Sequence, residues 1–368
     1  MLAHQEPSGA FLASRDFAPY HYCWLRDGSF VAFALGLAGE QGAAERFHRW
    51  VARSICGISG SVQEAVSRRQ AGGSNVVGSM PPARFAVDGA VCHDDWPNFQ
   101  VDGYGTWLWS LWEHISRFSS DGLIDELAPS VELAVAYLEA VGLDTCFDCW
   151  EENADAVHTS TLGCVYGGLR AAGSLLGSDK ASRRADDVRG VIESQMTLEG
   201  RFVKSSVSTD VDASLLWLAV PFGATRAGSP AMAATAEAVA ESLVLDGGTR
   251  RYPGDTYYGG GAWPLLTAWL GWYRSATGDL AEARRCQAWV EACFDPSGRL
   301  PEQCGGRQRD AASYNYWVAR WGPPAADLAW SHAMYFVLWD QLQDQAVLPS
   351  PGDGLPAARA AAPNPPIQ

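Results

Sequence analysis

Five short segments of this chain combine carboxylates, arginines and aromatic side chains, the residue types that bind and cleave polar substrates. They are YHYCWLRDG (20–28), DDWPNFQVDGYG (94–105), DCWEEN (148–153), RYPGDTYYGGGAW (251–263) and RLPEQCGG (299–306). If these segments enter the same end of one domain, their side chains converge on a single pocket, which is the usual form of a ligand site.

The chemistry that suits these residues is glycoside hydrolysis. The chain has no GxSxG elbow, phosphate-binding P-loop or HExxH motif, so the commonest alternatives are absent. Glycoside cleavage needs one protonated and one ionised carboxyl group, and charged Arg/Asp pairs bind sugar hydroxyls well. Trp150 beside Glu151 is a candidate apolar wall that would raise the pKa of an acid. One glutamate alone would be as consistent with a helix N-terminus, whereas the five segments together favour a site.

Two other clusters have simpler explanations. Cys146 and Cys149 form a single CxxC without a βαβ setting or a second cysteine pair, so a redox or metal role is not favoured. His93, Asp94 and Asp95 could ligate a metal, but polar residues ahead of a helix more often cap it or face solvent. We therefore expect no metal and no cofactor.

The elements that position these segments are predicted to be helices, because apolar residues recur with helical spacing and no stretch alternates as a strand. Six segments are rich in Trp and Gly with few charges, as in buried helices: 24–39, 102–116, 158–177, 211–223, 260–278 and 327–342. Five charged, amphipathic segments alternate with them: 41–55, 125–142, 180–196, 229–244 and 279–294.

This alternation predicts an all-α fold, an (α/α)6 barrel with an inner and an outer ring. One outer helix is missing from the pattern, so we expect eleven helices, no first outer helix and one exposed apolar seam. The barrel is predicted to occupy residues 1–342, and the Pro/Ala-rich residues 343–368 to form a disordered tail.

The composition of the chain indicates which classes of binding partner to expect. The net charge of −15 and the pI near 4.8 disfavour nucleic acid and anionic membranes. No apolar run is long enough to span a bilayer, and the N-terminus lacks a signal pattern, which together predict a cytoplasmic protein. The nine scattered cysteines are expected to be reduced. The 16 tryptophans exceed the usual share, which suits a pocket that stacks flat ligands such as sugars.

Six motifs in order give a resemblance to a known family. WLRD, WPNFQVD, WEE, RYPGDTYY, PEQ and DLAWSH span residues 20–332 and resemble the glucoamylase family, glycoside hydrolase family 15. The resemblance implies an (α/α)6 barrel and an inverting, exo-acting enzyme that releases β-glucose from non-reducing ends.

The resemblance also assigns roles by motif. Glu151 matches the general acid, Glu302 the general base, and Tyr20 the tyrosine that helps to place the attacking water. The remaining matches are substrate-binding positions: Arg26, Asp27, Trp96, Gln100, Asp102, Trp150, Glu152, Arg251, Tyr257, Trp263 and Trp330.

The chain departs from the family pattern by lacking an N-terminal β-sandwich and a starch-binding module. A bare barrel is most similar to the members that hydrolyse isomaltose, so a small oligosaccharide with an α-1,6 linkage is the expected substrate. A glucoamylase or a trehalase of the same family stays open, as does a non-catalytic sugar-binding or regulatory module. The presence of both Glu151 and Glu302 argues against the last alternative.

Overall fold

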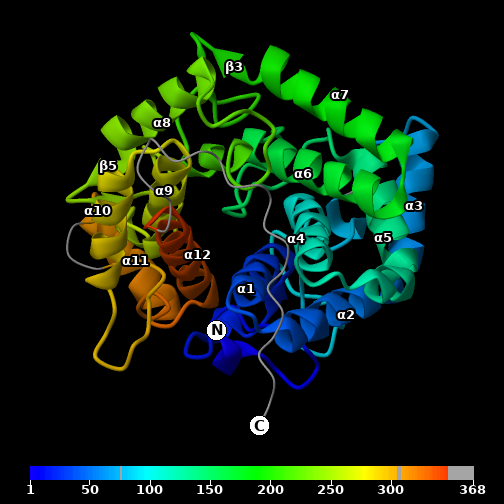
Figure 1. The fold of residues 1–368 in the computed structure, drawn as a ribbon, viewed down its shortest axis with the longest axis horizontal. Coiled ribbons are helices and arrows are strands. Elements are labelled where there is room, and N and C mark those ends of the chain that lie inside the picture. The colour runs from blue at the N-terminus through cyan, green and yellow to red at the C-terminus, as the bar shows by residue number, and fades with distance from the viewer. Residues whose placement is uncertain (75–76, 305–307, 347–368) are drawn as a thin grey trace.

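A computed structural model of the protein describes residues 1–74, 77–304 and 308–346, and its regular secondary structure is almost entirely helical (Figure 1). The α-helices of this part are α1 (Leu25–Leu37), α2 (Gln41–Gly57), α3 (Ser59–Gln70), α4 (Asp102–Phe118), α5 (Asp121–Val141), α6 (Thr159–Leu176), α7 (Asp179–Gln195), α8 (Pro230–Leu243), α9 (Pro264–Ala276), α10 (Leu280–Glu291), α11 (Ala311–Trp321) and α12 (Ala329–Ala346). The 3-10 helices are η1 (Leu2–His4), η2 (Ala18–Tyr20), η3 (Val77–Ser79), η4 (Ala213–Leu218) and η5 (Tyr257–Gly259).

Six helices form a closed inner ring. α1 packs on α4, α4 on α6, α6 on η4, η4 on α9, α9 on α12, and α12 returns to α1. These are the six segments predicted to be buried. Eleven of the thirteen residues of α1 are buried, as are all six of η4. The (α/α)6 barrel predicted from the alternation is therefore confirmed.

The fourth member of the ring, η4, is a short 3-10 helix. The Asp212 carboxylate caps its start by accepting from the backbone N–H and the hydroxyl of Ser214. Pro221 follows three residues after its end, and a proline disfavours the helical conformation in the residue before it. The predicted inner segment, residues 211–223, is therefore longer than the helix in the structure, because the prediction took no account of that proline.

The five predicted amphipathic segments form the outer layer as α2, α5, α7, α8 and α10 (Figure 1). α3 and α11 are additional helices that the pattern did not predict. In the described residues no α-helix occupies the outer position between α12 and α1, because residues 1–24 contain only two 3-10 helices, η1 and η2, and the short strand β1 (Cys23–Trp24). Trp339 of α12 is 38% exposed and its ring lies 5.5 Å from that of Phe336, and the apolar seam as a whole stays a prediction.

The strands are confined to loops, as predicted. They form three antiparallel pairs: β1 (Cys23–Trp24) with β2 (Arg84–Phe85), β3 (Thr197–Leu198) with β4 (Arg201–Phe202), and β5 (Val244–Leu245) with β6 (Gly248–Thr249). The first pair fixes the loop that leads into α1. It therefore holds the start of the inner ring at the end where the polar segments gather.

The centre of the ring is filled by aromatic side chains. Phe30 of α1 contacts Trp269 of α9 at 4.8 Å and stacks on Trp330 of α12 at 5.7 Å between ring centroids. Trp217 of η4 stacks on Trp269 at 4.9 Å. Trp217 and Trp269 therefore belong to a packed core beneath the ligand pocket that the tryptophan content suggested.

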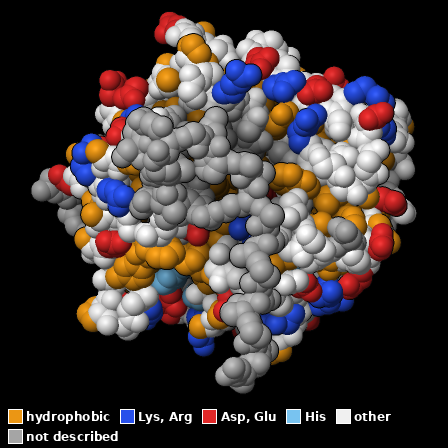
Figure 2. Space-filling view, viewed as in Figure 1, with side chains coloured by type: hydrophobic (Ala, Val, Ile, Leu, Met, Phe, Trp, Pro, Cys, Tyr) orange, Lys and Arg blue, Asp and Glu red, His pale blue; other side chains and the backbone are white. Residues whose placement is uncertain are grey.

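The surface carries acidic and basic side chains over the outer helices (Figure 2). No helix among the described residues combines the length and apolarity needed to cross a bilayer. α12 extends to Ala346, past the predicted end of the barrel at residue 342. The predicted tail from residue 347 onward lies outside the described residues.

Candidate active site

One cavity of about 320 Å³ opens among the loops that lead into the inner ring. All five polar segments contribute to its lining, so the predicted convergence is found in the structure. The predicted site residues that line it are Tyr20, Arg26, Asp27, Trp96, Trp150, Glu151, Glu152, Arg251, Tyr257, Trp263, Glu302 and Trp330. The volume lies at the low end of the roughly 300–1,000 Å³ typical of ligand pockets, which suits a small substrate.

The segment DCWEEN forms a tight turn organised by Asp148. The Asp148 carboxylate accepts from the backbone N–H groups of Trp150 and Glu152, both at 2.9 Å. Glu151 has φ +68°, a left-handed conformation that is uncommon outside glycine and often marks functional sites. In this turn the side chains of Glu151 and Glu152 point in different directions and contact different residues.

Glu151, the predicted acid, is hydrogen-bonded on one oxygen only. Trp24 Nε1 donates to Glu151 Oε1 at 2.7 Å, and Gln100 Nε2 donates to the same atom at 3.3 Å. Oε2 receives no hydrogen bond from the described part of the chain. The neighbouring Trp150 directs its own Nε1 to Asp212 at 3.0 Å, so Trp24 is the tryptophan that binds this carboxyl group.

Glu302, the predicted base, is 1% exposed and lies under two tyrosine hydroxyls. Tyr20 donates to its Oε1 at 2.6 Å, Tyr257 reaches its Oε2 at 3.5 Å, and the two hydroxyls are 2.8 Å apart. Burial raises the pKa of Glu302 to about 7, although the hydrogen bond from Tyr20 and the charge of Arg251 act to lower it. A base with that pKa is ionised above neutral pH and protonated below it.

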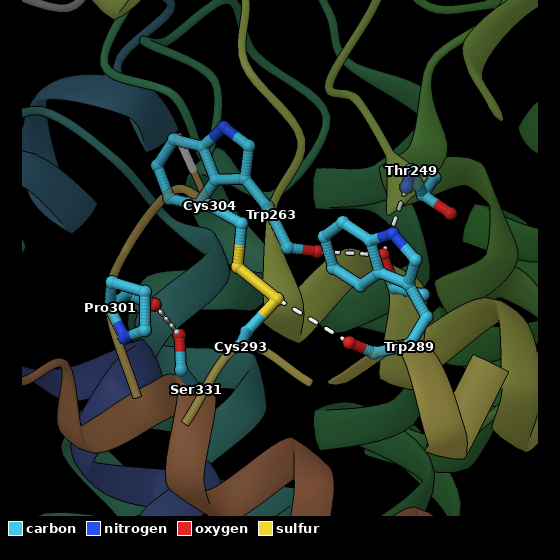
Figure 3. Close-up of a disulfide and its surroundings, with 8 residues drawn as sticks. Thr249, Trp263, Trp289, Cys293, Pro301, Cys304 and Ser331 are labelled. Atoms are coloured by element: carbon cyan, nitrogen blue, oxygen red, sulfur yellow. Dashed lines mark hydrogen bonds between the residues drawn. A yellow bond between two sulfur atoms is a disulfide. The ribbon is translucent and has the colours of Figure 1, made fainter. Parts of the chain in front are cut away.

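The segment around Glu302 is held by backbone hydrogen bonds and by a disulfide, and the disulfide is drawn in Figure 3. Glu302 N donates to Ala325 O at 2.8 Å, and Cys304 N donates to Ala262 O at 2.9 Å. Cys304 is bonded to Cys293, which follows the end of α10. The expectation that all nine cysteines are reduced is therefore wrong for this pair, because the fold brings two distant cysteines to a Cα–Cα separation of 6.1 Å.

Arg26 and Asp27 begin α1 and present charge at the floor of the cavity. Arg26 is 4% exposed and donates to Gln100 Oε1 at 2.9 Å and to Asp102 Oδ2 at 2.7 Å. Its guanidinium lies 5.4 Å from the Trp330 ring centroid. Burial raises the pKa of Asp27 to about 7, with Arg26 opposing that shift.

Gln100 and Asp102 were predicted to bind substrate, but neither lines the cavity. Both are buried and lie behind Arg26, whose guanidinium they hold in one orientation. Gln100 also donates to the Pro97 carbonyl at 2.8 Å, so it couples the loop before α4 to Arg26 and Glu151. These two side chains position the site rather than face its interior.

Arg251 and Glu152 form a second charged group on the wall. Arg251 is 3% exposed. Its guanidinium donates to both carboxylate oxygens of Asp255, with Nε 2.8 Å from Oδ2 and Nη2 bonded to Oδ1. The same Nη2 also donates to Glu152 Oε1 at 3.3 Å. Glu152 also accepts from the Tyr252 hydroxyl. Burial raises the pKa of Glu152, and Arg251 counteracts that shift. Glu152 therefore belongs to a different network from its neighbour Glu151.

Three of the tryptophans that line the cavity have an indole N–H without a hydrogen-bond acceptor among the described residues. The Nε1 atoms of Trp96, Trp263 and Trp330 are buried and have no acceptor in the described residues. Trp107 and Trp217, which do not line the cavity, also have an indole N–H without an acceptor among the described residues, so this feature does not by itself identify a ligand.

Sequence reasoning missed several residues of this site. Trp24 lies inside the WLRD motif, but its bond to Glu151 depends on a contact across 127 positions. Asp255 anchors Arg251 from within RYPGDTYY. Trp317, Arg320 and Trp321 of α11 also line the cavity, and their i, i+3, i+4 spacing was an available signal for one helix face.

The described residues contain no group of three His, Cys, Asp or Glu side chains that could hold a metal ion. Cys146 and Cys149 are free and buried, and burial raises the pKa of both thiols. Asp94, one of the weighed metal ligands, forms an ion pair with the buried Arg84.

Comparison with known proteins agrees with this geometry. The sequence model of glycosyl hydrolases family 15 matches residues 1–335. The chain belongs to this family. It is therefore a glycoside hydrolase, as the motifs of the sequence predicted.

Two other proteins are similar in sequence to this family 15 hydrolase. The isomaltose glucohydrolase of Kribbella flavida is 39% identical over 346 residues, which are 92% of this chain and 89% of the relative. An uncharacterized glycosyl hydrolase of Methanocaldococcus jannaschii is 28% identical over 95% of this chain and 55% of its own length.

Solved structures support the same fold. A wild-type glycosidase, 39% identical, superposes with a TM-score of 0.89 over 93% of this chain and 94% of its own. A glycosidase variant in complex with glucose has the same TM-score and coverage at 38% identity. A bacterial glucoamylase complexed with acarbose, 20% identical with a TM-score of 0.68 over 91% of this chain and 53% of its own, shares the barrel.

Proposed function

We propose that this family 15 hydrolase is an inverting exo-α-glucosidase that releases β-glucose from isomaltose and short α-1,6-linked gluco-oligosaccharides. The observation that carries the proposal is that Glu151 and Glu302 come from separate loops and line one small cavity with buried Arg26 and Arg251. The α-1,6 preference is supported by the 39% identity to an isomaltose glucohydrolase over nearly the whole chain.

In this proposal Glu151 donates a proton to the glycosidic oxygen. The bonds from Trp24 and Gln100 both end on Oε1, which fixes the carboxyl group and leaves Oε2 to carry the proton toward the leaving sugar. A general acid must hold its proton within hydrogen-bond reach of the leaving oxygen, and the turn around Asp148 supplies that fixed position.

Glu302 then acts as the base that removes a proton from the attacking water. Its raised pKa of about 7 matches a base that works near neutral pH. Tyr20 bonds to Oε1, so the weakly bonded Oε2 is the oxygen assigned to the water. Water that attacks the sugar face opposite the acid inverts the anomeric carbon and yields β-glucose.

The terminal glucose is bound by the charged floor and wall. Arg26 with Asp27, and Arg251 with Glu152, offer donors and acceptors to ring hydroxyls, and charged hydrogen bonds are strong and directional. The rings of Trp263 and Trp330 line the same cavity and offer apolar surface to a sugar face. A pocket of this size accepts one chain end rather than an internal segment, which accounts for exo action.

The roles of the two glutamates are tested by Glu151→Gln and Glu302→Gln. Each is expected to lower kcat for isomaltose by about 10²–10⁴-fold or more while the circular dichroism spectrum stays unchanged, because glutamine neither donates nor accepts the transferred proton. Glu64→Gln, on the exposed face of α3, is the matched control and should retain wild-type activity. Activity near the wild-type level in either site variant would refute the assignment.

The substrate and stereochemistry are tested by comparing isomaltose, maltose and trehalose at equal concentrations, with the product anomer followed by NMR immediately after mixing. The proposal expects the highest kcat/KM for isomaltose and β-glucose as the first product. A higher kcat/KM for maltose or trehalose would move the protein to the glucoamylase or trehalase alternative. An initial α-anomer would exclude inversion.

A further inference from the structure

Helix α11 (Ala311–Trp321) lies outside the two rings of the barrel. It begins at Asp310, whose carboxylate accepts from Ala312 N at 2.9 Å, and none of its residues is fully buried. Its main packing partner is η5, the short helix before α9. Apolar side chains gather on the face of the molecule over α11, where Tyr316 is 55% exposed (Figures 1 and 2). Because α11 contributes no buried residue to the core, its position is not explained by core packing.

One face of α11 is directed into the catalytic cavity. Trp317, Arg320 and Trp321 are spaced i, i+3 and i+4, so they share a side of the helix, and all three line the cavity. The Arg320 guanidinium lies 5.7 Å from the Trp317 ring and 5.1 Å from the Trp321 ring. The face is therefore an aromatic surface with one cation held over it.

The two tryptophans reach opposite sides of the cavity mouth. Trp321 stacks on Trp96, in the loop before α4, with centroids 6.0 Å apart and planes at 22°. Trp317 meets Tyr257 of η5, just before α9, at 5.2 Å. Because α4 and α9 are the second and fifth members of the six-helix ring, they lie across the ring from each other. Helix α11 thus spans the mouth.

We infer that Trp317, Arg320 and Trp321 form the subsite for the leaving sugar and make the enzyme selective for substrates with a sugar as leaving group. The inference rests on the proposed function and deepens it. In the proposed function the terminal glucose is bound by Arg26, Arg251 and their partners, and none of these residues belongs to α11. The α11 face has what a second pyranose needs, since indoles stack on its apolar face and a guanidinium donates to its hydroxyls.

The test compares two substrates that differ only in the group that leaves. Isomaltose places a glucose in the proposed subsite, whereas α-glucosyl fluoride releases fluoride and needs no sugar subsite. Trp321→Ala is expected to lower kcat/KM for isomaltose about 10–100-fold, mainly through KM, while kcat/KM for α-glucosyl fluoride stays within about twofold. Arg320→Ala should act in the same direction with a smaller loss, and Trp321→Phe should recover most of the isomaltose activity.

Asn315→Ala, on the exposed side of the same helix, is the matched control and should leave both substrates unchanged. Equal losses on both substrates in Trp321→Ala, or no loss on either, would overturn the inference while leaving the proposed function intact. A wild-type enzyme that hydrolyses neither substrate would instead refute the proposed function itself. Since α11 carries no buried residue, the variants are expected to keep the wild-type melting temperature, which checks that they fold.

Discussion

Two opposing effects act on the pKa of the proposed base Glu302. Burial favours its neutral form and raises its pKa to about 7, whereas the Tyr20 hydroxyl at 2.6 Å favours the charged form. The proton affinity of the base is therefore set by a hydrogen bond as well as by desolvation. This balance makes the pH dependence of catalysis a direct readout of the site.

The first prediction at this scale concerns Tyr20→Phe. The wild-type kcat/KM should fall as the pH drops below about 7, because protonated Glu302 cannot accept a proton. Removing the Tyr20 donor destabilises the charged carboxylate, so the acidic limb should move to higher pH. A hydrogen bond to a charged group contributes roughly 1.5–3 kcal/mol, which corresponds to a shift of about one pH unit or more. The measurement is a pH profile of kcat/KM for isomaltose.

Tyr22→Phe is the control for this prediction, since Tyr22 lies two residues away and packs on Arg84 without bonding to either glutamate. Its acidic limb should coincide with that of the wild type. A Tyr20→Phe limb that stays in place, whatever the height of the plateau, would show that Tyr20 does not set the proton affinity of Glu302.

At the residue scale, the sequence could predict which residue types meet but not which way each one faces. Because successive residues point in different directions, Glu151 and Glu152 were not expected to share one environment, and their side chains do bond to different partners. Gln100 and Asp102 carry the right chemistry, yet their side chains lie behind Arg26. Only the packing of the loop before α4 against α1 decides that orientation.

Periodicity predicted most of the helices that pack on the barrel, although it missed α3, which packs on α5 and buries Val62 and Ala65. The five outer helices and the six inner segments each bury a face or nearly all of their surface, so their apolar residues recur with helical spacing. Helix α11 buries no residue completely, and its aromatic residues serve the cavity. Tyr314, Trp317, Val318 and Trp321 nevertheless recur with helical spacing, so the sequence carried a signal for this helix that the alternation of inner and outer segments did not use.

The disulfide gives a prediction at the element scale. Cys293 follows α10 and Cys304 stands two residues after Glu302, so the bond ties the base segment to an outer helix (Figure 3). Closing an 11-residue separation in the unfolded chain contributes about 3 kcal/mol to stability in the chain-entropy model. Cys293→Ser should therefore lower the free energy of unfolding by about that amount. It should also lower kcat several-fold, because small displacements of a catalytic group are costly.

The measurement is chemical denaturation together with kcat for isomaltose, and a reductant added to the wild type should reproduce the effect of Cys293→Ser. Cys56→Ser is the control, because Cys56 is free and exposed. Free thiols at both positions in the purified, oxidised protein, detected by alkylation and mass spectrometry, would contradict the prediction. So would a variant as stable as the wild type.

At the scale of the whole molecule, the barrel depends on how closely neighbouring inner helices approach. α4 and α6 meet at glycines: a Cβ on Gly168 would lie 2.5 Å from the Cα and the carbonyl oxygen of Gly105. A contact with backbone cannot be relieved by rotating a side chain. Small residues in the Trp-rich inner segments are thus part of what closes the ring, and the close approach they allow outweighs the helix-weakening effect of glycine.

The last prediction compares two glycines that share helical geometry but differ in surroundings. Gly168→Ala should destabilise the protein by about 1–3 kcal/mol or more, because the added methyl group forces α4 and α6 apart. Gly190→Ala, in the outer helix α7 with nothing within 4 Å of the new Cβ, should stabilise it by up to about 1 kcal/mol. Denaturation curves of both variants measure the difference. If Gly168→Ala were as stable as Gly190→Ala, close contact between the inner helices would not be what holds the ring together, and aromatic packing around Phe30 and Trp269 would have to carry that role alone.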